Sequence, residues 1–132
     1  MENEALSDFC GILAMILFVF ANAYYPARLI ANQFRPWPRQ VAIFFKKYLD
    51  LHMYVNIVAF VIMTVHAHYS EERNMFLYAS LVVTVWLTIA GILMRNKSFS
   101  SDTKKQMRMI HTQQYVFFLW LFLLFIGHMA AE

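Results

Sequence analysis

The chain has 132 residues, of which 61% are hydrophobic and only 14% are charged, and its formal net charge is +3. A soluble domain is about 45–50% apolar and about 25% charged, so this composition excludes most soluble proteins, and a disordered chain would need the opposite balance. The single cysteine, Cys10, excludes an internal disulfide, and no Cys/His spacing resembles a zinc site. The composition therefore indicates a membrane protein.

Four apolar stretches follow one another along the chain, and each predicts a membrane-spanning helix. We place these helices at about 9–25, 41–68, 75–94 and 105–130, because roughly 20 apolar residues cross the hydrocarbon core. Strands are not expected, since the alternation typical of a β-barrel is absent from the sequence. The predicted fold is an all-α four-helix transmembrane bundle in up-down-up-down order, forming a single domain over residues 1–132.

The first stretch has to be distinguished from a signal peptide. It ends at residues 21–23 in Ala-Asn-Ala, which resembles a cleavage site. Its start, however, carries Glu2, Glu4 and Asp8 and no basic residue, whereas a signal peptide begins with positive charge. We interpret this stretch as a true span.

The connections between the stretches carry most of the charge. The first, 26–40, holds all three prolines and Trp37, which predicts an interfacial loop. The second, 69–74, is short and acidic, and the third, 95–108, is rich in Ser and Lys. Ten of the 11 basic residues flank the first and third connections, and only Arg73 lies on the other side. This asymmetry predicts that both basic connections are cytoplasmic and that both termini lie outside.

Four of the five histidines lie in or at the edge of the second and fourth stretches. His52 and His66 are fourteen residues apart, which is about 21 Å along a helix and within about 40° of one face. His111 and His128 likewise lie near the two ends of the fourth stretch, and they share the levels of His52 and His66 if successive helices alternate in direction. Histidine within a span is costly, so a functional role is expected. Two facing imidazoles are what the two axial positions of a haem iron require.

The segments KKYLDLHMYVNIVAFVIMTVHAH and MRMIHTQQYVFFLWLFLLFIGHM resemble the haem-bearing helices of di-haem b-type cytochromes. This group includes the ferric-reductase-like transmembrane domain and the cytochromes b linked to quinols and hydrogenases. The resemblance implies that His52, His66, His111 and His128 are axial ligands of non-covalent haem b. The lack of a C-x-x-C-H motif agrees with non-covalent haem.

From the resemblance we expect transmembrane electron transfer in a larger membrane oxidoreductase complex. A quinone or a partner redox subunit would exchange the electrons, because the short connections leave no room for a flavin or nicotinamide domain. We expect a multi-pass protein of a bacterial or archaeal cytoplasmic membrane, with membrane lipid and other subunits as partners and no nucleic acid.

Three hypotheses for the site stay open. The first is two haems. The second is a single haem on the non-cytoplasmic (outer) side, held by His128 with His66 or His68. The third is no cofactor, with the histidines as hydrogen-bonding groups between helices or as interfacial residues. His68 lies about 160° round the helix from His66, so we favour His66 as the ligand and His68 as a propionate partner, a quinone-site group or a solvated interfacial residue. Arg108 is a candidate propionate partner, and Gly127 is placed to admit a porphyrin beside His128.

The gap from His111 to His128 is seventeen residues, which is about 25 Å of rise and about 100° away from a common face. If both are ligands, the fourth helix must depart from regular α geometry between Thr112 and Gly127, or be tilted differently from the second helix. The rival function is a cofactor-free membrane anchor or assembly subunit. A histidine proton relay ranks last, because Asp50 is the only carboxylate near a span.

Overall fold

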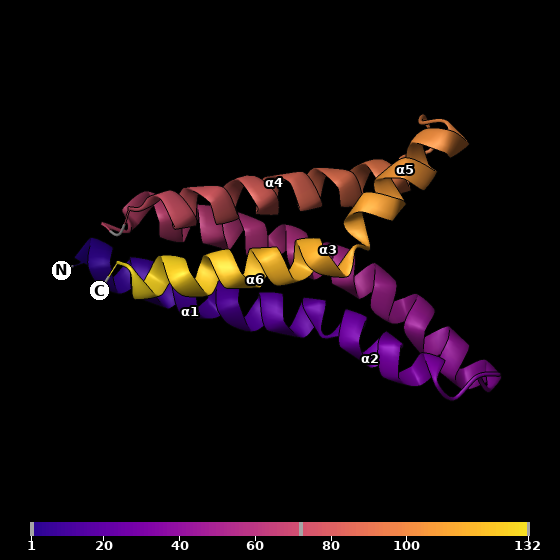
Figure 1. The fold of residues 1–132 in the computed structure, drawn as a ribbon. Coiled ribbons are helices and arrows are strands. Elements are labelled where there is room, and N and C mark those ends of the chain that lie inside the picture. The colour runs from indigo at the N-terminus through magenta and orange to yellow at the C-terminus, as the bar shows by residue number, and fades with distance from the viewer. Residues whose placement is uncertain (1, 72, 132) are drawn as a thin grey trace. The chain divides into compact units, whose positions relative to one another are not determined.

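The computed structural model describes residues 2–71 and 73–131, and every regular element within them is helical (Figure 1). The helices in chain order are α1 (Glu2–Asn22), α2 (Tyr24–Asn32), α3 (Arg39–Tyr69), α4 (Met75–Arg95), α5 (Ser101–His111) and α6 (Gln114–Met129). The chain divides into two compact units, Met1–Tyr69 and Ser70–Glu132. Each unit is a helical hairpin, and the expectation of one domain over the whole chain stays a prediction.

The described helices confirm the prediction of an all-helical protein with candidate membrane spans. In the described part of the chain, Asn3–Asn32, Arg39–Tyr69 and Met75–Arg95 are each long and apolar enough to cross a bilayer. The bent pair Ser101–His111 and Gln114–Met129 would be a fourth, broken span. Large apolar side chains are exposed along these helices, as Phe9, Val82 and Phe125 illustrate at 64%, 67% and 66%. Helices with apolar residues on every side are expected where lipid surrounds the outer surface.

In the first unit, α1 and α3 run antiparallel and side by side (Figure 1). Small side chains are buried between them: Ala21 and Ala59 are fully buried and Ala14 is 3% exposed. In lipid, helix association is driven by close backbone approach rather than by a hydrophobic difference between helix and solvent, so small residues favour it. This alanine seam brings the two helices close enough for side chains of α3 to reach the backbone of α1.

The first connection is shorter than the interfacial loop predicted at 26–40. The chain turns at Ala23 and resumes as α2, which continues through Pro26 to Asn32, so only residues 33–38 lie outside helices. Pro26 lies in the first turn of α2, where a missing N–H does not remove an intrahelical bond. The prediction was wrong at this point because the proline begins a new helix instead of ending the helical region.

In the second unit, α4 and α6 pack antiparallel through polar and small residues. The indole Nε1–H of buried Trp120 donates to Thr84 Oγ1 at 2.8 Å. Asn74 caps α4 by accepting from the Leu77 N–H at 3.0 Å, and its Nδ2 donates to the Gly127 carbonyl at 2.6 Å. A single amide therefore ties the first turn of α4 to the last turn of α6.

The third connection is also shorter than predicted, and the fourth helix is broken. Ser100 caps α5 by accepting from the Thr103 N–H at 3.2 Å, so helical structure begins before residue 105. It stops at Thr112 and Gln113, where the chain bends by 49° between α5 and α6. Thr112 Oγ1 donates back to the Arg108 carbonyl at 2.7 Å, a local bond that bends helices. The helix therefore breaks at the start of the interval 112–127, where the sequence required a departure only if His111 and His128 are both ligands.

Candidate functional site

His52 lies on the face of α3 that packs against α1. Its Nδ1 is 2.9 Å from the carbonyl oxygen of Ala21, and since a carbonyl only accepts, Nδ1 carries the proton and donates. One turn along α3, Asn56 Nδ2 donates to the His52 carbonyl at 2.8 Å, and Asn56 Oδ1 accepts from Asn22 Nδ2 at 3.3 Å. The Tyr24 ring lies 5.6 Å from the imidazole, centroid to centroid. Asn56 Nδ2 also lies 3.2 Å from His52 Nδ1. The shorter contact to the Ala21 carbonyl favours the tautomer with the proton on Nδ1, in which the lone pair is on Nε2.

His66 is held by α1 in the same way. Its Nδ1 donates to the Ser7 carbonyl at 2.8 Å, and the buried Ser7 hydroxyl donates to the His66 carbonyl at 3.3 Å. The ring lies over Gly11, where a Cβ would come within 2.9 Å of Cε1 and Nδ1. Only a glycine leaves room for the imidazole at this position.

The two imidazole sites therefore form a repeat along the hairpin. The acceptors Ser7 and Ala21 are fourteen residues apart on α1, as His52 and His66 are on α3. The prediction that both histidines share one face of their helix is confirmed, because both bond to α1. Ala59, midway between them, is fully buried.

The histidines of the second unit lie in different surroundings. His111 is the last residue of α5 and is half-buried, and its Cε1 is 3.6 Å from where a Cβ of Gly91 would lie. His128 is exposed, and its Nδ1 donates to the Leu124 carbonyl one turn earlier at 2.8 Å.

Gly127 is a point of close helix packing. It is buried, and a Cβ there would come within 2.7 Å of Leu77 Cδ2 and 3.1 Å of the Leu77 backbone nitrogen. The space that the sequence assigned to a porphyrin edge is filled by Leu77 of α4 in this structure.

The two remaining candidates lie on the surface of their units. His68 is exposed, and its ring meets the Tyr69 ring edge-on at 5.0 Å between centroids. Arg108 is exposed on α5. A role of either residue beside a haem propionate stays a prediction.

Three of the four imidazoles make a hydrogen bond that is compatible with an axial ligand of haem iron. Within residues 2–71 and 73–131, no group of three or more His, Cys, Asp or Glu side chains gathers as a metal site, but a haem iron takes only its axial ligands from the protein. A metal-bound histidine commonly donates its other ring N–H to a backbone carbonyl. His52, His66 and His128 each make such a bond through Nδ1. The expected pairs join residues of the two units and stay predictions.

Sequence reasoning missed the residues on α1 that hold the α3 histidines. Ser7 and Gly11 make the site for His66, and Asn22 supports the Asn56 amide beside His52. A signal for them exists in the first stretch, where small residues recur at helical spacing from Ser7 through Gly11 and Ala14 to Ala21. That spacing indicates a helix-packing face, although the partner helix is not visible in it.

The chain was compared with protein-family models, with curated proteins and with solved structures. No family model, curated protein or solved structure matches it.

Proposed function

We propose that the protein carries electrons across a membrane through b-type haem. The duplicated arrangement on α3 supports this best: two histidines on one face of a candidate span each have Nδ1–H bound to an α1 carbonyl. Such a bond orients the ring, leaves the lone pair on Nε2 and raises the basicity of the ligand. Haem iron, when bound, supplies reversible one-electron transfer.

Each group of residues has a distinct part in this proposal. His52 and His66 of α3, with His111 and His128 of the second unit, would hold the haem iron. The carbonyls of Ser7 and Ala21 orient the α3 rings, while the apolar surroundings exclude water. The electron donor and acceptor are a quinone or another subunit of a membrane redox complex, because the connections between helices are short.

The test is the haem content of the purified full chain. A pyridine haemochrome assay is expected to give about two haems per chain, and an oxidised and reduced spectrum is expected to show low-spin bis-imidazole iron. One haem per chain would leave only the outer site. No haem in a folded preparation would exclude the proposal.

Single histidine variants assign the ligands. His66→Ala and His128→Ala are each expected to remove the outer haem, and His52→Ala and His111→Ala the inner one, because loss of an axial imidazole weakens or abolishes haem binding. His68→Ala is the matched control, since His68 is exposed two residues from His66, and it is expected to keep both haems. An inner haem that survives His111→Ala with an unchanged low-spin spectrum would show that His111 is not a ligand.

A cofactor-free membrane anchor is the second candidate, and one observation favours it. The imidazoles of α3 join α3 to the α1 backbone, a bond that stabilises a hairpin without any metal. In that case the purified protein lacks a Soret band, and His52→Ala and His66→Ala lower the stability of the haem-free chain. The haem assay separates the two functions.

A further inference from the structure

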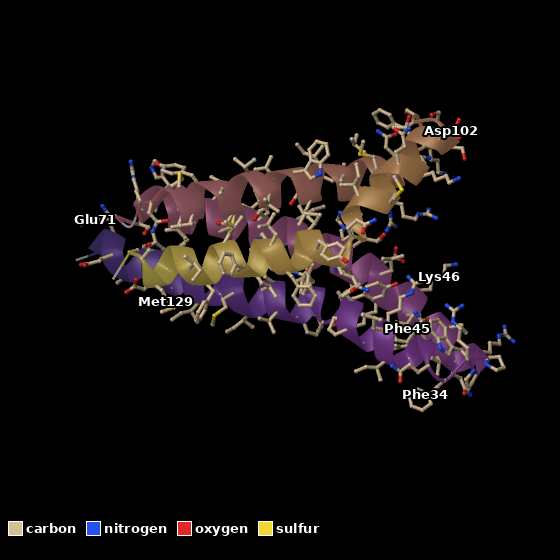
Figure 2. All side chains as sticks on the ribbon, in the orientation of Figure 1. Phe34, Phe45, Lys46, Glu71, Asp102 and Met129 are labelled. Carbon is tan, nitrogen blue, oxygen red and sulfur yellow. The ribbon has the colours of Figure 1, made fainter. Side chains whose placement is uncertain are left out.

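The end of the first unit that holds residues 33–38 concentrates positive charge. Five basic residues lie on α2, on the connection and on the first turns of α3: Arg28, Arg35, Arg39, Lys46 and Lys47. Asp50 is the single carboxylate between residues 9 and 70. Phe34, Phe45 and Lys46, labelled in Figure 2, lie at this end.

The guanidinium groups of Arg28 and Arg35 each contact a ring of one aromatic cluster. Trp37 stacks on Phe45 with centroids 5.1 Å apart and planes at 23°, and Phe45 meets Tyr24 edge-on at 6.0 Å. The Arg35 guanidinium lies 4.6 Å from the centre of the Trp37 ring, and Arg28 Nη1 donates to the Tyr24 hydroxyl at 2.7 Å. We name this group the cationic corner; it consists of Tyr24, Arg28, Arg35, Trp37 and Phe45.

The cationic corner is connected to both α2 and α3. Trp37 Nε1 donates to the Ala31 carbonyl at 2.6 Å, which fastens the connection to the end of α2. Phe45 and Tyr24 are buried, at 8% and 9% exposure. Trp37 and Arg35, together with Pro36, line an open depression of about 510 Å³. The Arg35 guanidinium is therefore held beside this depression, on a ring that is hydrogen-bonded to α2.

The depth of the cationic corner matches the headgroup layer of a bilayer. α3 has 31 residues, or about 46 Å at 1.5 Å per residue, which exceeds the ~30 Å hydrocarbon core. Its ends therefore extend beyond the hydrocarbon. Next to the cationic corner, Ile30 and Phe34 are 61% and 73% exposed, which suits contact with acyl chains, and tryptophan and tyrosine favour the interface.

We propose that the cationic corner binds the phosphate of an anionic phospholipid headgroup, with Arg28 and Arg35 as donors. Neither guanidinium forms an ion pair with a carboxylate of the described residues, and a planar guanidinium fork matches phosphate geometry. Basic groups at the membrane surface attract anionic lipids, and arginine stacked on an aromatic ring keeps its N–H edge available for the ligand. The site is independent of haem binding.

The test measures lipid affinity of the intact chain in detergent by native mass spectrometry. Phosphatidylglycerol is expected to bind more tightly than phosphatidylcholine. Arg28→Gln combined with Arg35→Gln is expected to weaken phosphatidylglycerol binding about twenty-five-fold, at about fivefold for each cation. Phosphatidylcholine binding is expected to weaken less, because the choline cation already offsets the charge of its phosphate. Equal affinities for the two lipids, or a double variant that binds as the native chain does, would overturn the proposal.

A matched control removes the same charge elsewhere. Lys104→Gln combined with Lys105→Gln changes two residues of α5 in the second unit, and it is expected to keep the affinity of the tightest phosphatidylglycerol site. An equal loss in this control would mean that net charge, not the cationic corner, attracts the lipid, and the proposal would fail.

Two further measurements test the role of the planar guanidinium group and the identity of the ligand as a lipid. Arg35→Lys keeps the charge but loses the planar fork over Trp37, so it is expected to bind phosphatidylglycerol at an affinity between those of the native chain and the double variant, with unchanged helical circular dichroism. Millimolar inorganic phosphate is expected not to displace the lipid. Displacement would identify a site for a soluble anion and would contradict a lipid site.

Discussion

A Cβ at residue 11 would lie 2.9 Å from Cε1 and Nδ1 of His66, closer than such atoms approach in proteins. Gly11→Ala is therefore expected to displace the imidazole and lengthen its bond to Ser7, which costs about 1–3 kcal/mol as an overpacked contact. Chemical unfolding of the purified chain in detergent measures this change. Gly11→Ala as stable as the native chain would show that the contact between His66 and α1 contributes little.

Gly91→Ala is the matched control for this prediction. At Gly91 the nearest atom to a new Cβ is His111 Cε1, at the ordinary contact distance of 3.6 Å. Alanine also has the higher helix propensity, by about 1 kcal/mol. Gly91→Ala is therefore expected to be neutral or slightly stabilising in the same measurement.

The hydrogen bond between Trp120 and Thr84 is a second contact whose contribution to stability can be measured by substitution. Thr84→Val keeps the shape of the side chain but removes the acceptor 2.8 Å from the buried indole N–H, and about 1–2 kcal/mol of stability is expected to be lost. Thr84→Ser restores the acceptor and is expected to recover most of the loss. Thr88→Val, which removes a bond within α4 only, is the control and is expected to change stability less.

At the scale of elements, the seam between α1 and α3 depends on small residues. Ala59 is fully buried, so Ala59→Leu is expected to push the helices apart and to lower stability by about 1–3 kcal/mol. Ala67→Leu places the same side chain on an exposed position of α3 and is expected to leave stability unchanged. If the two variants unfold alike, α1 and α3 do not form a tight seam.

The elements also show where local patterns mislead. Three prolines and a tryptophan indicated a loop over 26–40, yet Pro26 lies in the first turn of α2. The run of basic residues indicated a connection up to residue 108, yet Ser100 caps a helix that begins at Ser101. Both helix starts carry signals in the sequence, a proline in the first turn and a serine cap with Asp102 after it. Composition alone conceals them, because polar or proline-containing segments can still form helices.

For the whole molecule, the distribution of basic residues predicts orientation. Single cysteines at Gln33 and Ser98, both exposed in connections rich in basic residues, are expected to react with a membrane-impermeant thiol reagent from the cytoplasmic side only. A cysteine at Glu71, exposed in the acidic connection, is expected to react from the opposite side. If the cysteine introduced at Ser98 reacts from the outside, the predicted topology is wrong and the opposite orientation holds.

The native thiol requires a control in this labelling experiment. Cys10 is buried, at 8% exposure, and it is replaced by serine in the parent variant. Inverted and right-side-out vesicles of the same preparation then report both faces, so a position that reacts in neither marks a buried site and not an orientation.

The sequence by itself determined the membrane class, the order of the apolar segments and the common face of His52 and His66. These properties depend on hydropathy and on the helical repeat, which are local along the chain. The choice between one, two or no haems is not determined at this level, because it depends on which imidazoles meet.

Only the tertiary structure decided which partners these residues find. His66 and Ser7 are 59 residues apart, and their bond exists because alanines let α1 and α3 approach in one register. Leu77 fills the space at Gly127 because the bond from Asn74 to the Gly127 carbonyl holds the first turn of α4 against α6. Contacts of this range depend on the register and separation of whole helices, which packing determines collectively and which no single segment encodes.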